Sequence, residues 1–144
     1  MKLWEKYHTP GTIDEALEIL TSYAGAARVV AGGTDLLVEM RDGEHEPFPA
    51  LVDITSVLEL RNIEQENDSA ILGAGVTHTQ IVKSALLSSR ATCLVESCGV
   101  VGGPQVRNVA TLGGNVAHAL PAADGTTSLV ALDAKVDIVK DGKR

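Results

Sequence analysis

Two glycine pairs constrain this chain more than any other feature, because each pair lies between an apolar run and an apparent helix. The sequence reads VVAGGTDLL at residues 29–37 and VATLGGNVA at residues 109–117. Glycine has no Cβ, so the backbone can adopt positive φ and approach a ligand closely. A glycine turn that leads into a helix directs free N–H groups outward, which together with the helix dipole favour an anion such as phosphate. Two such loops could hold a pyrophosphate between them.

The alternative interpretation is that each glycine pair forms a tight structural turn. Neither loop matches G-x-G-x-x-G or G-x-x-x-x-G-K-[ST], which disfavours a Rossmann dinucleotide fold and an ordinary P-loop ATPase. Two loops of the same form weaken the structural interpretation without removing it. Both interpretations therefore stay open on the glycines alone.

Composition excludes several classes of function. Aromatic residues make up 3% of the chain against 44% for all hydrophobic residues, so the core is mostly aliphatic and a mixed helix and strand class is favoured. The net charge is -7 and no Lys/Arg run exists, so nucleic acid and anionic membranes are poor partners. No apolar stretch reaches the ~18 residues of a membrane span. With only Cys93 and Cys98 and no signal peptide at the start, we expect a cytoplasmic, reduced protein.

The first part of the chain predicts a compact strand–helix–strand unit over residues 1–55. Thr12 and Glu15 have capping-box spacing and mark the start of an amphipathic helix, which Gly25 ends. The other expected elements are strands at 3–8, 27–32 and 51–54, a helix at 35–43, and a proline-containing loop at 44–50.

The second part, residues 56–144, predicts a hairpin followed by helices. The hairpin strands are expected at 62–67 and 70–75, and Thr77 is expected to cap a single helix that runs to residue 89. Further expectations are a helix at 91–103, a loop at 104–115, a helix after Asp124 and a strand at 135–139. A DG turn signal follows that strand without a return strand, so we expect the chain to be a fragment or a subunit that ends unusually early. We expect Lys135–Lys140 to be a strand with one edge that is unpaired or paired with another molecule.

The residues around both glycine pairs carry a resemblance. The segments VVAGGTDLLVEMRDG, GAGVTHTQI and QVRNVATLGGNVAHALPAADGTTSLVALDAKV occur in this order. They resemble the flavin-binding domain of the molybdenum hydroxylases, a group that includes xanthine dehydrogenase and the medium subunit of bacterial carbon monoxide dehydrogenase. The resemblance covers essentially the whole chain. It implies an α+β fold of two small subdomains of the vanillyl-alcohol-oxidase/PCMH type, at residues 1–55 and 56–144, with the C-terminal domain absent.

The resemblance also implies a set of cofactor contacts. The first glycine loop and its flanks would wrap the pyrophosphate of FAD through the backbone, and the second loop would form another wall. Asp124, at the start of the last helix, would reach ribityl or ribose hydroxyls, and Ala122 would be a further contact, although Leu120 stands where a small polar residue is common. The implied FAD contacts are Ala31, Gly32, Gly33, Thr34, Asp35, Leu36, Ala110, Thr111, Gly113, Gly114, Asn115, Ala122 and Asp124.

The function implied by the resemblance is that of an oxidoreductase subunit. FAD held here would take electrons from iron–sulfur clusters and pass them to NAD or another acceptor, while a molybdopterin subunit oxidises the substrate. Without a further domain, we expect this chain alone to bind FAD weakly or not at all and to be inactive. One alternative is a non-catalytic scaffold that has lost FAD, and another is a phosphate-ligand module unrelated to redox chemistry.

Other conspicuous residues favour structural roles. The four histidines have no ligand spacing, so no metal site is expected, and no residue pattern indicates a catalytic group. Cys93 and Cys98 are five positions apart in an apparent helix and do not share a face. Arg107 and Asn108 either brace the second loop or are solvated, and the sequence does not decide between these roles.

The first prediction concerns one glycine of each loop. Gly33→Val or Gly114→Val in a complete subunit should abolish FAD retention while the fold survives, because the valine side chain would fill space meant for phosphate. The strain and overpacking should cost on the order of 1–3 kcal/mol or more. Flavin absorbance of the purified variants measures this, and stoichiometric FAD in both would contradict the assignment.

Overall fold

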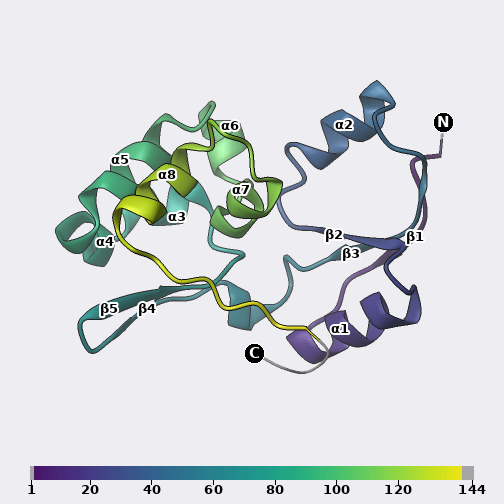
Figure 1. Cartoon of the computed structure of the whole chain (residues 1–144), viewed down its shortest axis with the longest axis horizontal. Helices are drawn as coiled ribbons and strands as arrows, with labels where there is room; N and C mark the ends of the chain where they lie inside the picture. The colour runs from purple at the N-terminus through teal and green to yellow at the C-terminus, as the bar shows by residue number, and fades with distance from the viewer. Residues whose placement is uncertain (1, 141–144) are drawn as a thin grey trace. The chain divides into compact units, whose positions relative to one another are not determined.

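The structure, a computed structural model, describes residues 2–140 and divides into two compact units (Figure 1). Unit 1 comprises Met1–Glu59 together with the segment that begins at Asp137, and unit 2 comprises Leu60–Val136. Helices and small sheets occur in both units, so the predicted α+β class is confirmed. No described helix is long and apolar enough to cross a bilayer.

Unit 1 is a parallel sheet with a helix on each face. The strands are hydrogen-bonded in the order β1-β3-β2, so β3 is central. Figure 1 shows α1 on one side of this sheet and α2 on the other. The elements are β1 (Trp4–His8), α1 (Ile13–Ser22), β2 (Ala27–Val30), α2 (Leu36–Asp42) and β3 (Phe48–Asp53).

Local signals fix the ends of the unit 1 helices. The Thr12 hydroxyl caps α1 by accepting a bond from the amide of Glu15 at 3.2 Å, and the Glu15 carboxylate accepts one from the amide of Gly11 at 2.7 Å. After α1, Ala24 and Gly25 adopt positive φ, which ends the helix. The start and stop predicted for this helix are confirmed.

The strand β3 begins earlier than the sequence predicts. Residues 48–50 were expected to lie in a loop because of the prolines, yet Phe48 pairs with Trp4 of β1. The neighbour on the other side, β2, pairs only from Ala50 onward. Pro49 therefore lies where β3 has one neighbour, and its missing N–H costs no bond to β2. The loop prediction was wrong at these positions.

The core of unit 1 lies between the sheet and its helices. Val30, Met40 and Leu51 are buried together, with Leu37 packed against them. The neighbouring β3 residue Val52 is fully buried as well. Because Val30 is the last residue of β2, the strand is anchored in the core directly before the first glycine loop.

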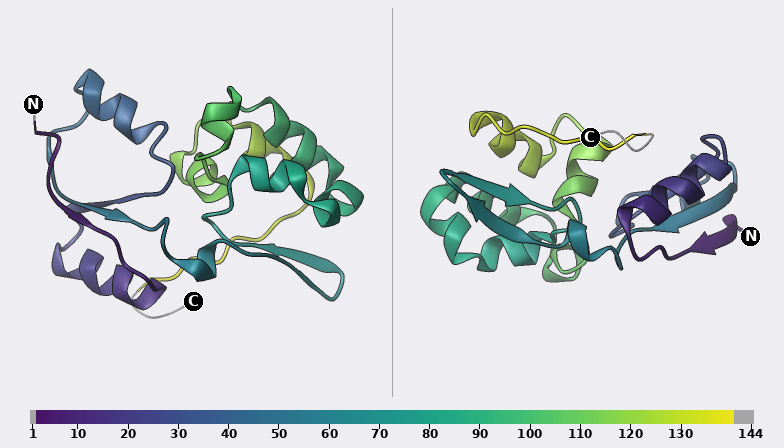
Figure 2. Two further views of the ribbon diagram at one scale, coloured as in Figure 1. Left: turned by 180° about the vertical axis from the view of Figure 1, so that it is seen from behind. Right: turned by 90° about the horizontal axis from the view of Figure 1, so that it is seen from below.

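Unit 2 is a cluster of short helices with an antiparallel hairpin (Figure 2). The predicted hairpin is confirmed, with Asn67 at positive φ in its two-residue turn. A short 3₁₀ helix, Leu58–Leu60, precedes it. The elements are β4 (Ile63–Glu66), β5 (Ser69–Leu72), α3 (His78–Lys83), α4 (Ala85–Arg90), α5 (Thr92–Val100), α6 (Pro104–Arg107), α7 (Leu112–His118) and α8 (Asp124–Ala131).

Two expectations for the helices of unit 2 were wrong. The single helix expected at 77–89 is divided at Ser84, whose backbone is extended and whose hydroxyl accepts a bond from the amide of Leu87 at 3.3 Å. Ser84 thus ends α3 and caps α4. The loop expected at 104–115 contains α6, which has Pro104 in its first turn, and the start of α7, capped by Thr111.

The strand expected at 135–139 is not present. Residues 134–139 belong to no helix or strand, and Val136 and Ile138 are exposed. A strand needs a neighbour to take up its amides and carbonyls, and the two described sheets are formed by other strands. The expected DG turn lies outside the described residues.

A buried histidine lies in unit 2 at the start of α3. His78 is 1% exposed, and its Nδ1 has no hydrogen-bond partner among the described groups. Burial lowers the pKa of His78; Arg107 adds to this effect, whereas the charge of Asp124 opposes it. The imidazole is therefore neutral at pH 7 in the folded chain.

The second glycine loop is bonded to the segment that precedes α3. Leu112 N donates to Val76 O at 2.9 Å, and Gly113 N donates to Ala74 O at 2.9 Å. A Cβ built on Gly113 would lie 2.5 Å from that Ala74 oxygen. Gly113 is thus required by a close approach of the chain's own backbone.

We expect unit 2 to lose stability in mild acid because of His78. Its pKa is below the ordinary 6.5 only in the folded state, so the unfolded chain takes up a proton first and stability falls as the pH drops below 6.5. His78→Leu should remove the part of the acid-induced loss of stability that comes from this histidine. Stability at pH 8 should stay nearly unchanged, because no other group loses a hydrogen bond to the imidazole. Chemical denaturation at pH 8 and pH 5 measures this. Equal losses in the wild type and the variant would contradict it.

We also expect Gly113→Ala to destabilise unit 2. The new methyl group would meet backbone atoms that cannot move aside, at a cost of roughly 1–3 kcal/mol. Gly99→Ala in α5 is the matched control, because its Cβ would make only an ordinary 3.9 Å contact with Val82. The control should be neutral or gain up to about 1 kcal/mol. Thermal unfolding compares the two variants, and similar midpoints would show that Gly113 is not tightly packed.

Candidate functional site

The first glycine loop connects β2 to α2 in unit 1. Gly33 has φ +67°, and a Cβ there would lie 3.3 Å from side-chain atoms of both Val30 and Leu37. Its carbonyl accepts the amide of Leu37 at 3.1 Å, which starts the turn into α2. A side chain at position 33 is therefore disfavoured twice, by the backbone conformation and by the available space.

The amides of the first loop are free for a ligand. Within residues 2–140, no group accepts a hydrogen bond from the backbone N–H of residues 32–36. The loop is only partly buried at Gly32 and Gly33, and the Asp35 side chain is exposed and makes no capping bond to α2. The Leu36 side chain packs against the core of unit 1, so its contribution to a site would come from its backbone. Five adjacent unbonded amides form a surface suited to an anion.

The amides of the second loop are already used. In addition to the bonds of Leu112 and Gly113 described above, Gly114 N donates to the Thr111 hydroxyl at 3.1 Å and Asn115 N to the Thr111 carbonyl at 3.0 Å. The glycine pair lies inside the first turn of α7, and neither glycine has positive φ. The expectation that both loops present free amides was therefore wrong for residues 112–115.

The two sets of expected contact residues lie in different units. Unit 2 brings the second loop next to the start of α8, because Asn115 Oδ1 would lie 2.9 Å from a Cβ on Gly125. The Thr126 hydroxyl also lies 3.5 Å from Asn115 Oδ1. Ala110 and Thr111 are buried, whereas Ala122 and Asp124 are exposed beside this contact. Whether any of these residues contacts FAD stays a prediction.

Arg107 and Asn108 brace the backbone before the second loop. Arg107 Nη1 donates to the carbonyls of Val101 and Gly102 at 3.1 and 2.9 Å. The Thr79 hydroxyl donates to Asn108 Oδ1 at 2.7 Å, which ties α3 to the end of α6. Of the two roles that the sequence left open, these bonds favour bracing.

Sequence reasoning missed a polar pair at the end of the unit 1 sheet. The Tyr7 hydroxyl donates to Asp53 Oδ2 at 2.6 Å, and Thr55 N donates to Asp53 Oδ1 at 2.8 Å. Burial and the bond to Asp53 raise the pKa of Tyr7 to about 12. Burial alone would raise the pKa of Asp53, but the bonds from Tyr7 and Thr55 hold it below its ordinary value. The sequence signal that could have indicated this pair is the aspartate that ends the apolar run of β3.

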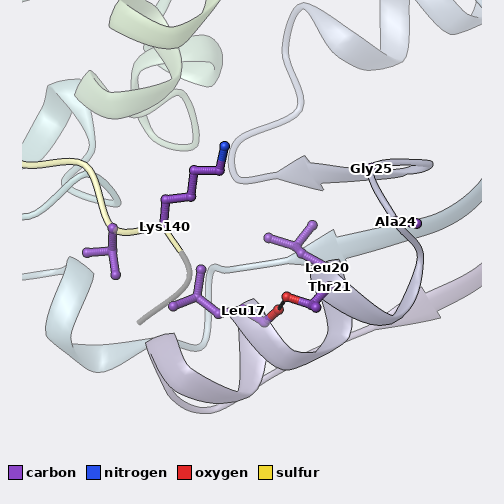
Figure 3. A pocket seen from close by; sticks show the side chains of 7 residues that line it. Leu17, Leu20, Thr21, Ala24, Gly25 and Lys140 are labelled. Atoms are coloured by element: carbon purple, nitrogen blue, oxygen red, sulfur yellow. Dashed lines mark hydrogen bonds between the residues drawn. The ribbon is translucent and has the colours of Figure 1, made fainter. Parts of the chain in front are cut away.

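A separate open pocket of about 390 Å³ lies in unit 1 (Figure 3). Leu17, Leu20 and Thr21 of α1 line it, together with the following turn and Lys140. The Thr21 hydroxyl is bonded to the carbonyl of Leu17, and no residue of either glycine loop lines the pocket. Among the described residues, no group of three or more His, Cys, Asp or Glu side chains could hold a metal ion.

Known proteins match almost the whole chain. Residues 3–144 match the family described as "FAD binding domain in molybdopterin dehydrogenase". The chain is 32% identical to the xanthine dehydrogenase FAD-binding subunit of Escherichia coli O157:H7, over 92% of this chain and 45% of that protein. It is 35% identical to the nicotinate dehydrogenase FAD-subunit of Eubacterium barkeri, over 91% of this chain and 44% of that protein.

A solved structure supports the same relationship. Carbon monoxide dehydrogenase from Hydrogenophaga pseudoflava, which lacks the Mo-pyranopterin moiety in that crystal, superposes with a TM-score of 0.78 at 32% identity, over 82% of this chain and 41% of that chain. The chain thus spans less than half the length of these relatives. The resemblance stated from the two glycine segments is confirmed: the chain belongs to the family of FAD-binding domains of molybdopterin dehydrogenases.

Proposed function

We propose that this chain forms part of the FAD-binding component of a molybdenum hydroxylase and that its first glycine loop holds the pyrophosphate of FAD. The observation that carries the proposal is the row of unbonded amides at residues 32–36, next to a glycine held at positive φ. Pyrophosphate oxygens accept several hydrogen bonds at once, so they complement such a row. FAD contains such a pyrophosphate, and membership in a family of FAD-binding domains supports FAD as the ligand.

The residues of the first loop fit the group in their chemistry. Backbone amides are part of the main chain, so, unlike the ends of flexible side chains, they offer donors to an anion at fixed positions. The Thr34 hydroxyl is one additional donor beside them. Bound FAD supplies electron transfer, and this chain supplies position and exclusion of water. In unit 2, the amides of the second loop are used internally, and the exposed Asp124 carboxylate is by its chemistry an acceptor for sugar or ribityl hydroxyls.

The wider role follows from the relatives. These are FAD subunits or medium chains of xanthine, nicotinate and carbon monoxide dehydrogenases. We therefore propose that the chain works beside an iron–sulfur subunit and a molybdopterin subunit, receives electrons from the clusters, and passes them to NAD or another acceptor. This role is proposed from relatives of which the chain matches less than half the length.

A titration followed by ¹⁵N NMR tests the assignment of the first loop. FAD added to the chain should shift the amides of residues 32–36, with a dissociation constant weaker than about 1 μM because binding must offset lost translational and rotational freedom. Gly33→Val should weaken this binding by at least about tenfold, since valine at positive φ would also crowd Val30 and Leu37.

Gly43→Val is the matched control for Gly33→Val. Gly43 lies at the other end of α2 with φ +79°, and a Cβ there would meet nothing within 4 Å. Both variants carry the strain of valine at positive φ, but only one changes the loop. Gly43→Val should bind FAD like the wild type. No amide shift at millimolar FAD, or equal losses in both variants, would contradict the proposal.

A further inference from the structure

The Tyr7–Asp53 pair lies where the sheet of unit 1 meets the first glycine loop. In the parallel register Tyr7 pairs with Leu51, and Asp53 pairs with Val30. Paired residues in neighbouring parallel strands point to the same face, and residues two apart on one strand do so as well. Tyr7, Asp53 and Val30 therefore share the sheet face that carries α2, at the carboxyl ends of the strands.

The carboxylate of Asp53, the last residue of β3, binds two other segments of unit 1. One oxygen accepts the Tyr7 hydroxyl of β1 at 2.6 Å, and the other accepts the amide of Thr55 in the turn after β3 at 2.8 Å. The backbone amide of Ile54, which lies between Asp53 and Thr55, donates to the carbonyl of Val30 at 3.0 Å. Val30 is the residue immediately before the loop, so the end of β3 is the last support of β2.

Among the described strands, β3 alone supports β2 through hydrogen bonds. The strand is four residues long and lies at an edge of the described sheet, so its core packing has a single neighbouring strand beside it. Any movement of the end of β3 is therefore transmitted to Val30 and the first residues of the loop. A carboxylate that accepts a hydroxyl at short distance is a strong and directional tie, and here it links the central strand to the far edge strand β1.

We propose that Tyr7 and Asp53 are positioning residues for the first glycine loop. Their hydrogen bond fixes the end of β3, and β3 fixes Val30, so the amides of residues 32–36 stay aligned before any ligand arrives. The consequence for cofactor affinity rests on the proposed function, because preordered donors bind an anion more tightly than mobile ones. Neither side chain needs to touch the cofactor.

Tyr7→Phe tests this proposal by removing a single hydroxyl. Tyr23→Phe is the matched control, because the Tyr23 hydroxyl bonds His8 Nε2 at 3.0 Å in the same unit without involving β3. Two measurements are made on each protein: ¹⁵N relaxation order parameters of the amides of residues 32–36, and the dissociation constant for FAD. Thermal midpoints show whether the two variants lose comparable stability.

We expect Tyr7→Phe to lower the order parameters of the loop and to weaken FAD binding by about tenfold, while Tyr23→Phe changes neither. Asp53→Asn should reproduce the effect of Tyr7→Phe on the loop, and the double variant should add little to either. An unchanged loop in Tyr7→Phe, or equal loosening in Tyr23→Phe, would overturn the proposal. Absence of FAD binding by the wild type would count against the proposed function alone, since the order parameters still decide the positioning role.

Discussion

Backbone amides need hydrogen-bond partners, and this requirement separates the two glycine loops. In the second loop, the amides of residues 112–115 are all bonded within unit 2, to carbonyls and one hydroxyl of the chain itself. In the first loop, the amides of residues 32–36 have no partner among the described residues. Unbonded amides persist only where water or a ligand reaches them. The similar sequences AGGT and LGGN thus serve different purposes in the fold.

Close backbone packing explains the glycines of unit 2. A Cβ on Gly73 would lie 2.3 Å from the backbone of Leu60, and a Cβ on Gly113 would lie 2.5 Å from Ala74. Gly73 and Ala74 lie in the segment that leads into α3, which begins at the buried His78. The second loop, the segment before α3 and the helix core are therefore one packed body, whereas the first loop depends on β2 and the end of β3 for its position.

The sequence predicted most of the helices and strands, because their signals are local. The hydroxyls of Thr12 and Thr77 cap their helices by accepting bonds from backbone amides three residues further on, and the hairpin at Asn67 needs only its two strands. The failures depend on distant contacts. Pro49 is tolerated in β3 because β2 is short, and residues 134–139, where a strand was expected, belong to neither of the two described sheets. Likewise, the two loops differ because amides of the second loop donate to the carbonyls of Val76 and Ala74, which no local pattern reveals.

Hydrogen–deuterium exchange of the unliganded chain tests the central claim most directly, because it reports the bonding of each amide without a cofactor. If the first loop is the open anion site and the second is bonded internally, the amides of residues 32–36 should exchange at rates close to those of an unprotected peptide. The amides of residues 112–115 should be protected at least as strongly as the rest of α7. Equal exchange in the two loops, or protection of residues 32–36 alone, would contradict this account.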